Sequence, residues 1–441
     1  MTIYALSSGP GLSGVAVIRI SGEETQSILK LLTKKDLPRP RVATLSKIID
    51  SNNSELIDEA LVLWFPGPNS YTGEDMAEFH VHGSMAVIKA IHKALEDTKK
   101  CRIAEPGEFT KKAFQNGKIN LLKAESIADL ISSETEIQRK QAIAIMSGKT
   151  SRIFNEMRDL LLKSLSNIEA KIDFPEEELS EEVLSNTKEN IDRVIQKIQK
   201  ILNDQKVGER IREGFKIAIV GPTNAGKSSL LNHLSNRDVA IVSEIAGTTR
   251  DVLETHLNID GYPVIISDTA GIREAKSEIE QKGIKLALKK AEEADLNLIV
   301  IEPKSLDFTG FLKDLINPNS ILVINKCDIE KVSLTEQMKK IDHVIISVKN
   351  NTNIDNLIST IKSKLKGKFI KAEEILITRE RHRVNLEQCL ENLINFQNQK
   401  NDFDKAAEDL RLATRHLGII VGKVEVEEIL GSIFNDFCIG K

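Results

Sequence analysis

The sequence predicts a multidomain protein with an N-terminal α+β domain, a helical domain, and an α/β domain inserted into the helical one. Three observations lead to this prediction: a length of 441 residues, helical periodicity on both sides of residues 211–371, and strands that alternate with helices inside that range. A chain of this length exceeds the size at which a single hydrophobic core keeps growing, so two or three domains are expected.

Composition argues against several classes of protein. The formal net charge of −4 gives no bulk attraction to nucleic acid or anionic membrane, so such a partner would need a local basic patch. The four cysteines form no C-x-x-C pair, which argues against a zinc site or a disulfide framework. The start MTIYALSSGPG lacks signal-peptide features, and no apolar run approaches the roughly 20 residues that span a bilayer. We therefore expect a soluble, cytoplasmic protein without membrane attachment.

Residues 1–118 predict a small α+β domain. The runs GVAVIRI, ALVLWF and AEFHVH have the composition of strands, and SMAVIKAIHKAL has helical periodicity. His80 and His82 have the spacing of two ligands on one strand face, but no third ligand is evident in the sequence. A structural or pocket role is expected for these histidines.

Residues 119–210 and 372–441 predict long amphipathic helices. Apolar residues recur at three- and four-residue spacing from about Leu121 to Gln205, and again from about Arg379 to Phe437. A break is expected at residues 173–175, because proline disfavours helical geometry in the residue before it. Each block alone would leave an apolar face uncovered, so we expect the two blocks to form one discontinuous helical domain.

Residues 211–371 predict an α/β domain with a phosphate-binding loop. The strand KIAIV leads into GPTNAGKSS, which matches G-x-x-x-x-G-K-S, and then into a helix. Backbone N–H groups of such a loop close around phosphate oxygens, and the helix N-terminus adds a favourable dipole. In this motif Lys227 reaches the terminal phosphates and Ser228 can ligate Mg²⁺. The alternative interpretation is a glycine-rich turn that binds no ligand. Such a turn would not require the strand before it or the helix after it.

Further motifs favour a nucleotide site specific for guanine. Residues 268–271 (DTAG) follow a strand and offer a carboxylate to Mg²⁺, and residues 247–249 (GTT) offer a hydroxyl. Residues 325–328 (NKCD) end in an aspartate that can accept both N–H donors of a guanine edge. Their order resembles that of the GTPase family, with a last motif at residues 347–349. There Val348 replaces the usual small residue, which a backbone contact to the base would tolerate.

This resemblance implies the residues that form the GTP site. They are Asn224, Ala225, Gly226, Lys227, Ser228, Ser229, Ser243, Glu244, Ile245, Ala246, Gly247, Thr248, Thr249, Asp268, Thr269, Ala270, Gly271, Asn325, Lys326, Asp328 and Ser347. Ras-like enzymes place a water-orienting glutamine directly after DTAG, whereas this chain has Ile272. Hydrolysis therefore needs another group, and Glu274, Glu278 and Glu280 are the candidates that the residues alone leave open.

The segments NAGKSSLLN, IAGTTRD, DTAGIRE, PNSYTGEDMAEFHVHG and FCIGK together resemble the MnmE (TrmE) family of tRNA-modification GTPases over essentially the whole chain. The resemblance implies a tetrahydrofolate-binding and dimerisation domain at 1–118, and a helical domain at 119–210 and 372–441. It also implies a Ras-like P-loop G domain at 211–371, with a parallel-rich sheet and helices on both faces.

The resemblance also implies the activity. It implies a K⁺-dependent GTPase that adds a (carboxymethyl)aminomethyl group to C5 of the wobble uridine of certain tRNAs. The one-carbon unit would come from 5-formyl- or methylene-tetrahydrofolate. The protein would be a homodimer through its N-terminal domain, and would join the FAD-dependent protein MnmG in a heterotetramer or larger complex. The alternative is a regulatory GTPase in ribosome or stress signalling, which takes no direct part in chemistry.

Site residues beyond the nucleotide contacts also follow from the resemblance. The expected K⁺ ligands are Asn224, Ser243, Ile245 and Thr248, and the expected Mg²⁺ ligands are Ser228 and Thr249. Glu280 is expected to position the catalytic water. The expected folate-binding residues are Arg19, Glu78, Lys118 and Lys441, with Cys438 as a catalytic thiol near the one-carbon unit.

The C-terminal FCIGK allows a further alternative, in which Cys438 carries a lipid and the protein is a membrane-attached signalling GTPase. Its four-residue spacing fits a C-a-a-X box, but Gly440 and Lys441 match the usual residues of that box poorly.

Overall fold

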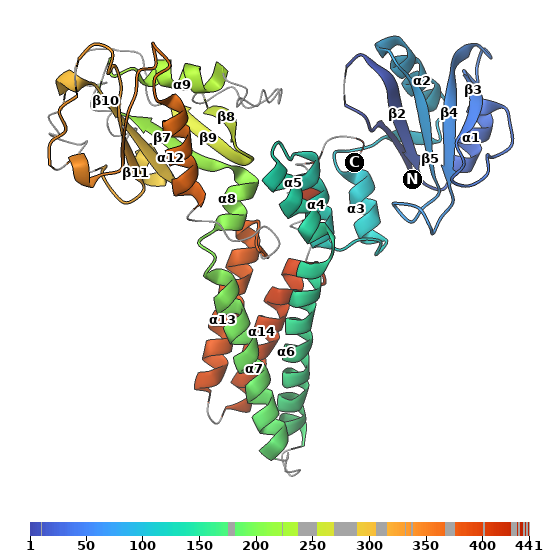
Figure 1. Ribbon diagram of the computed structural model, residues 1–441. Helices are drawn as coiled ribbons and strands as arrows, with labels where there is room; N and C mark the ends of the chain where they lie inside the picture. Colours follow the sequence, from blue (N-terminus) through green and yellow to red (C-terminus); the bar gives the residue numbers. More distant parts are fainter. Residues whose placement is uncertain are drawn as a thin grey trace, which may run out of the picture. The chain divides into compact units, whose positions relative to one another are not determined.

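The computed structural model describes residues 1–9, 11–174, 181–222, 224–236, 254–268, 289–305, 315–330, 332–336, 338–366, 375–399 and 402–424, with 430, 433, 434, 437 and 440. The chain divides into two compact units (Figure 1). The first contains Met1–Ala128, Ile145–Glu177 and Asn401–Lys441, and the second contains Asp129–Ala144 and Glu178–Lys400.

A six-stranded sheet forms the N-terminal part of the first unit, in the order β3-β4-β5-β2-β1-β6. Its strands are β1 (Thr2–Leu6), β2 (Ser13–Ser21), β3 (Thr44–Ile49), β4 (Leu56–Phe65), β5 (Met76–Gly83) and β6 (Cys101–Ile103). All neighbours are antiparallel except β1 and β6. The strands expected at GVAVIRI, ALVLWF and AEFHVH are β2, β4 and β5, which confirms the predicted α+β class.

Helices cover one face of this sheet. Residues that alternate along β2, β4 and β5, including Ile18, Val62 and Phe79, share a buried core with α1 (Thr25–Thr33) and α2 (Met85–Asp97). The third helix, α3 (Glu108–Gln115), follows β6. The intervening strand positions turn to the opposite face, where Arg19 and Glu78 are direct neighbours in the register of β2 and β5.

Long helices complete the first unit. Helix α4 (Leu121–Ile131) follows α3, and α6 (Lys149–Asp173) packs against α14 (Phe403–Val421). Helix α6 ends at Asp173, where the predicted break before Pro175 begins. The second unit pairs α7 (Glu181–Leu202) with α13 (Glu380–Asn398) and also contains most of α5 (Glu136–Met146). In both units, a helix of the 119–210 block packs against a helix of the 372–441 block.

The short helix α8 (Val207–Glu213) leads from α7 into the second sheet and carries a buried ionic cluster. Arg383 donates to Glu209 at 2.7 Å and to Asp204 at 2.6 Å, and its side chain is only 5% exposed. Both carboxylates compensate the buried guanidinium charge, which is the arrangement that a buried cation requires. These contacts join α13 to the segment that enters the nucleotide-binding strand.

A second six-stranded sheet has the order β12-β11-β10-β7-β9-β8. Its strands are β7 (Phe215–Val220), β8 (Glu254–Ile259), β9 (Tyr262–Asp268), β10 (Leu296–Ile301), β11 (Ser320–Ile324) and β12 (His343–Ile345). All pairs are parallel except β8 with β9. Buried clusters on both faces, one of them shared with α9 (Lys227–Asn236) and α12 (Ile354–Lys366), confirm the predicted α/β class.

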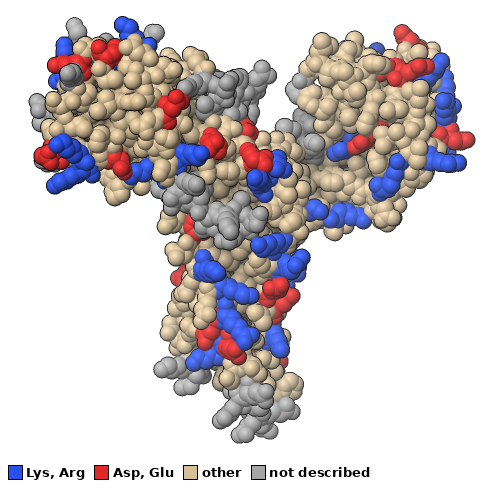
Figure 2. All heavy atoms as spheres, viewed as in Figure 1, with Lys and Arg blue, Asp and Glu red and all other residues tan. Residues whose placement is uncertain are grey.

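The surface carries charges of both signs. Lys and Arg side chains lie interspersed with Asp and Glu over the viewed face (Figure 2), in keeping with the small net charge of −4. Within the described residues, no helix combines the length and apolar character that a membrane crossing requires.

Candidate functional site

The predicted phosphate-binding loop connects β7 to α9, and two of its glycines are required by close packing. A Cβ built on Gly221 would lie 2.0 Å from the Val300 carbonyl oxygen, and one on Gly226 would lie 2.2 Å from Asn325 Nδ2. Both glycines have positive φ angles of 150° and 93°, and Asn224 between them has a φ of 64°. The loop therefore needs residues that tolerate left-handed backbone at these positions.

Lys227 and Ser228 begin helix α9 at the end of this loop. The Lys227 ammonium group donates to the carbonyl oxygens of Gly221 at 2.9 Å and Pro222 at 2.7 Å, so its side chain lies back over the loop. A bound phosphate would offer this cation a charged acceptor, which forms a stronger hydrogen bond than a carbonyl does. Ser228 is exposed at the first turn of the helix, where its hydroxyl can reach a metal ion.

Asn325 connects this loop to the predicted guanine-binding residues. Its side chain is 3% exposed; Nδ2 donates to the Ala225 carbonyl at 3.0 Å, and Oδ1 accepts from the Val348 N–H at 3.2 Å. The Val348 side chain packs against the hydrophobic core of the sheet. The amide of Asn325 thus holds two segments of the site together.

Lys326 and Asp328 follow Asn325 in the predicted guanine-binding motif. Lys326 has a φ of 64° and forms an ion pair with Glu302 at 2.8 Å. Asp328 is exposed, and a hydrogen bond from the buried Ser347 hydroxyl, with the charges of Lys349 and Lys326, lowers its pKa. A carboxylate held in its charged form is the acceptor that two guanine N–H donors need.

The structure thus brings Ala225, Gly226, Asn325 and Ser347 into one region at the carboxyl ends of β7 and β11. Asp268 ends β9, where its backbone pairs with Ile219 of β7. Other predicted residues lie outside the described part of the chain: Ser243, Glu244, Ile245, Ala246, Gly247, Thr248, Thr249, Thr269, Ala270, Gly271, Glu280, Cys438 and Lys441. The roles assigned to them stay predictions.

The predicted folate residues Arg19 and Glu78 form a close ion pair on the sheet face opposite α1 and α2. Arg19 Nη2 lies 2.9 Å and Nε lies 3.0 Å from Glu78 Oε1, and the side chains are 18% and 17% exposed. The guanidinium carbon of Arg19 lies 5.9 Å from the centre of the Tyr71 ring and 5.7 Å from that of Phe109. These aromatic contacts hold the cation in place.

The C-terminal tail reaches the same pair. The Gly440 carbonyl oxygen accepts from Ser7 Oγ at 2.8 Å and lies 3.5 Å from Arg19 Nη1. Phe434 and Phe437 are buried in a cluster with Leu121, and a Cβ on Gly107 would lie 2.7 Å from the Phe434 carbonyl oxygen. The described part of the tail is therefore docked by packing, and Gly440 lies beside Arg19.

Lys118 lies against a different residue, Gly73, where an added Cβ would be 2.9 Å from Lys118 Cε. Tyr71, Phe109 and the Gly440 contact could not be predicted from the sequence, because aromatic rings and a backbone carbonyl form no sequence motif.

The two histidines of β5 each contact a carboxylate: His82 Nδ1 lies 2.8 Å from Asp58, and His80 Nε2 lies 3.2 Å from Glu78. Among the described residues there is no group of His, Cys, Asp and Glu that could hold a metal ion.

A phosphate-binding loop between a parallel strand and a helix, with an Asn-Lys-x-Asp loop beside it, defines the class of P-loop GTP-binding proteins. Comparison with known proteins narrows the class. The family model described as "MnmE helical domain" matches residues 121–438, and that described as "GTP-binding protein TrmE N-terminus" matches residues 2–118. The chain therefore belongs to the MnmE (TrmE) family of tRNA modification GTPases.

Individual relatives agree with this family. The tRNA modification GTPase MnmE of Pelagibacter ubique is 70% identical over 100% of both chains, and that of Rickettsia akari is 45% identical over 100% of both chains. Among solved structures, an Aquifex aeolicus Era variant bound to GDP.AlF4- is 29% identical to this chain. The match covers 41% of this chain and 66% of the Era chain, with a TM-score of 0.27.

Proposed function

We propose that this GTPase, together with the FAD-dependent protein MnmG, modifies C5 of the wobble uridine of certain tRNAs with a tetrahydrofolate one-carbon unit. The observation that carries this proposal is the docking of the C-terminal tail beside the Arg19–Glu78 pair, with Gly440 in contact with Ser7. A regulatory GTPase needs neither a second polar site nor a tail fixed beside it. Relatives that match over the full length bear the name tRNA modification GTPase.

At the folate site, Arg19 and Glu78 would contact the reduced pterin, and Lys118 and Lys441 would contact its acidic tail. A reduced pterin has N–H groups that can donate to the Glu78 carboxylate, and acceptor atoms to which the Arg19 guanidinium can donate. The ion pair can therefore bind both kinds of group on the ring. Cys438 would act as the catalytic thiol at the one-carbon unit, the role that its match to the family implies.

At the nucleotide site, Lys227 would neutralise phosphate charge and Asp328 would select guanine. Ser228 and Thr249 would hold Mg²⁺, and Asn224, Ser243, Ile245 and Thr248 would hold K⁺. The exposed Ser228 hydroxyl and the exposed, left-handed Asn224 fit such roles. Bound cations stabilise the negative charge that develops on the transferred phosphoryl group. Glu280 would orient the attacking water.

The proposed protein is a cytoplasmic homodimer joined through domain 1–118. The sheet face that bears Arg19 also exposes Leu45 of β3 and Leu61 of β4, at 63% and 43%. A second copy seated on this face would bury these side chains and enclose the folate residues. The helical domain (119–210 and 372–441) would then transmit closure of the G domain (211–371) to the folate site.

The thiol provides the test that separates the two activities of this proposal. Cys438→Ser should hydrolyse GTP at the parent rate and fail to modify tRNA in a reconstituted reaction with MnmG, because serine is a far weaker nucleophile than a thiolate. Modification at the parent rate would contradict the role of the thiol. Loss of GTP hydrolysis would contradict the separation of the two sites.

A further inference from the structure

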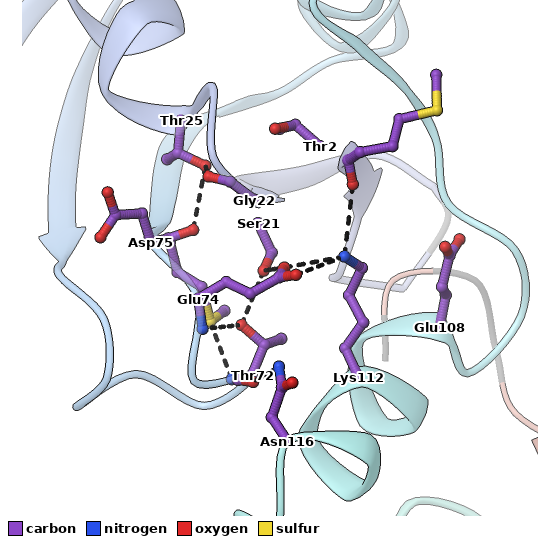
Figure 3. Close-up of polar contacts among 12 residues, drawn as sticks. Thr2, Ser21, Gly22, Thr25, Thr72, Glu74, Asp75, Glu108, Lys112 and Asn116 are labelled. Atoms are coloured by element: carbon purple, nitrogen blue, oxygen red, sulfur yellow. Dashed lines mark hydrogen bonds and ion pairs between the residues drawn. The ribbon is translucent and has the colours of Figure 1, made fainter.

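The N-terminal domain holds a second polar cluster, distinct from the Arg19–Glu78 pair. It includes part of the loop of residues 66–75 that connects β4 to β5, called the β4–β5 loop here. Figure 3 shows the side chains that meet there: Ser21, Thr72, Glu74, Lys112 and Asn116. Ser21 ends β2, Lys112 belongs to α3, Asn116 follows that helix, and the other two belong to the loop.

An ion pair forms the centre of this cluster. Lys112 Nζ lies 2.8 Å from Glu74 Oε1 and 2.9 Å from Oε2, and the two side chains are 16% and 29% exposed. Glu74 Oε2 also accepts from Ser21 Oγ at 2.9 Å. Both oxygens of the carboxylate are thus engaged by charge-assisted hydrogen bonds, which are stronger than neutral ones.

Thr72 is the point at which the loop is anchored. Its side chain is fully buried, and Oγ1 lies 2.8 Å from Ser21 Oγ and accepts from the Glu74 N–H at 3.2 Å. Its carbonyl oxygen accepts from Asn116 Nδ2 at 2.7 Å. The loop is therefore fixed at Thr72 by β2 on one side and by the end of α3 on the other.

The residues on either side of Thr72 contact the two proposed folate-binding cations. The Tyr71 ring lies 5.9 Å from the Arg19 guanidinium carbon, and its hydroxyl is bonded to Thr110 at 2.9 Å. Gly73, with a φ of 81°, faces Lys118 so closely that a Cβ would lie 2.9 Å from Lys118 Cε. The anchored loop thus touches both Arg19 and Lys118.

We propose that Lys112 and Glu74 are positioning residues for the folate site, because they fix the β4–β5 loop that sets the separation of Arg19 and Lys118. This inference rests on the proposed function. Lys112 and Glu74 act through Tyr71 and Gly73 and do not themselves contact the folate. A purely structural ion pair would change the stability of the domain and leave the folate affinity of the folded protein unaltered.

The test measures binding of 5-formyltetrahydrofolate to the full-length protein by calorimetry, alongside GTP hydrolysis and thermal unfolding. Lys112→Met keeps the aliphatic stem and removes the charge, so folate should bind about tenfold more weakly while GTP hydrolysis stays at the parent rate. Lys112→Arg should restore the affinity to within about twofold, because the guanidinium can still reach both carboxylate oxygens.

A matched control is present in the same domain. Lys100 and Glu24 form an ion pair of 2.6 Å, with side chains 35% and 46% exposed, that includes no residue of the loop. Lys100→Met should therefore leave folate binding unchanged. If Lys100→Met weakens binding as much as Lys112→Met does, the effect is general to the domain and the positioning role is wrong.

Two more variants separate the remaining outcomes. Glu74→Gln retains an acceptor for Ser21 and removes only the charge, so weaker binding at an unchanged melting temperature supports positioning even if Lys112→Met folds poorly. Parent-like affinity in both Lys112→Met and Glu74→Gln overturns the inference. Arg19→Ala should abolish binding; if it binds folate normally, the proposed folate site itself is wrong and the inference falls with it.

Discussion

At the residue scale, the Asn-Lys-x-Asp loop contains a buried side chain, Asn325, that joins two segments, and an exposed one, Asp328, that is proposed to bind guanine. The order of the motifs predicted that Asn325 and Asp328 belong to the nucleotide site, with Asp328 as the acceptor for guanine. It could not predict that the Asn325 amide bridges Ala225 and Val348, because that contact joins segments distant in sequence. Likewise, no local signal identifies the Tyr71 and Phe109 rings around Arg19.

Asp328→Asn tests the proposed selection of guanine. The exposed Asp328 carboxylate has a lowered pKa, so it stays charged as the pH falls below the ordinary carboxyl range and keeps accepting two N–H donors. An asparagine amide offers one donor in place of an acceptor. GTP affinity should fall by about tenfold to a hundredfold, with a gain for xanthosine triphosphate, in a nucleotide titration. Asp342→Asn, at an exposed carboxylate elsewhere in the domain that pairs with Lys364, should change neither affinity.

At the element scale, the strongly periodic and continuous apolar segments were predicted well. The predicted strand KIAIV is β7, which is largely buried and pairs in parallel with β10 and β9, as its apolar composition indicates. The antiparallel edge strand β8 was missed, because ETHLNI is short and polar. Its turn, Asp260-Gly261, has φ angles of 53° and 91°, and an Asp-Gly pair between two strand-like runs is the signal that could have found it.

The exposed apolar side chains on β3 and β4 of the first sheet make the predicted dimer testable. Leu61→Glu places a charge beside Leu45 on the same face of this sheet. It should shift the protein from dimer to monomer in sedimentation velocity, because an unpaired charge is costly to bury in an apolar interface. Met85→Glu is the control: Met85 is 53% exposed on α2, which covers the other face. A dimer that survives Leu61→Glu at micromolar concentration would contradict an interface on this face.

At the scale of the whole molecule, one chain carries a nucleotide-binding loop and a second polar site built by its two ends. Ser7 and Arg19 from the N-terminal sheet meet Gly440 from the far end of the sequence. Local sequence patterns cannot predict such a contact, because it joins residues more than 400 positions apart. Only the resemblance of the FCIGK tail to its family indicated that the terminus belongs to a site.

The most direct test of the account is nucleoside analysis of tRNA from cells that lack this protein. C5-modified wobble uridines should disappear from the tRNAs that carry them, and should return when the parent gene is restored. An unchanged nucleoside profile would contradict the proposed function and would favour a regulatory GTPase that takes no part in the chemistry.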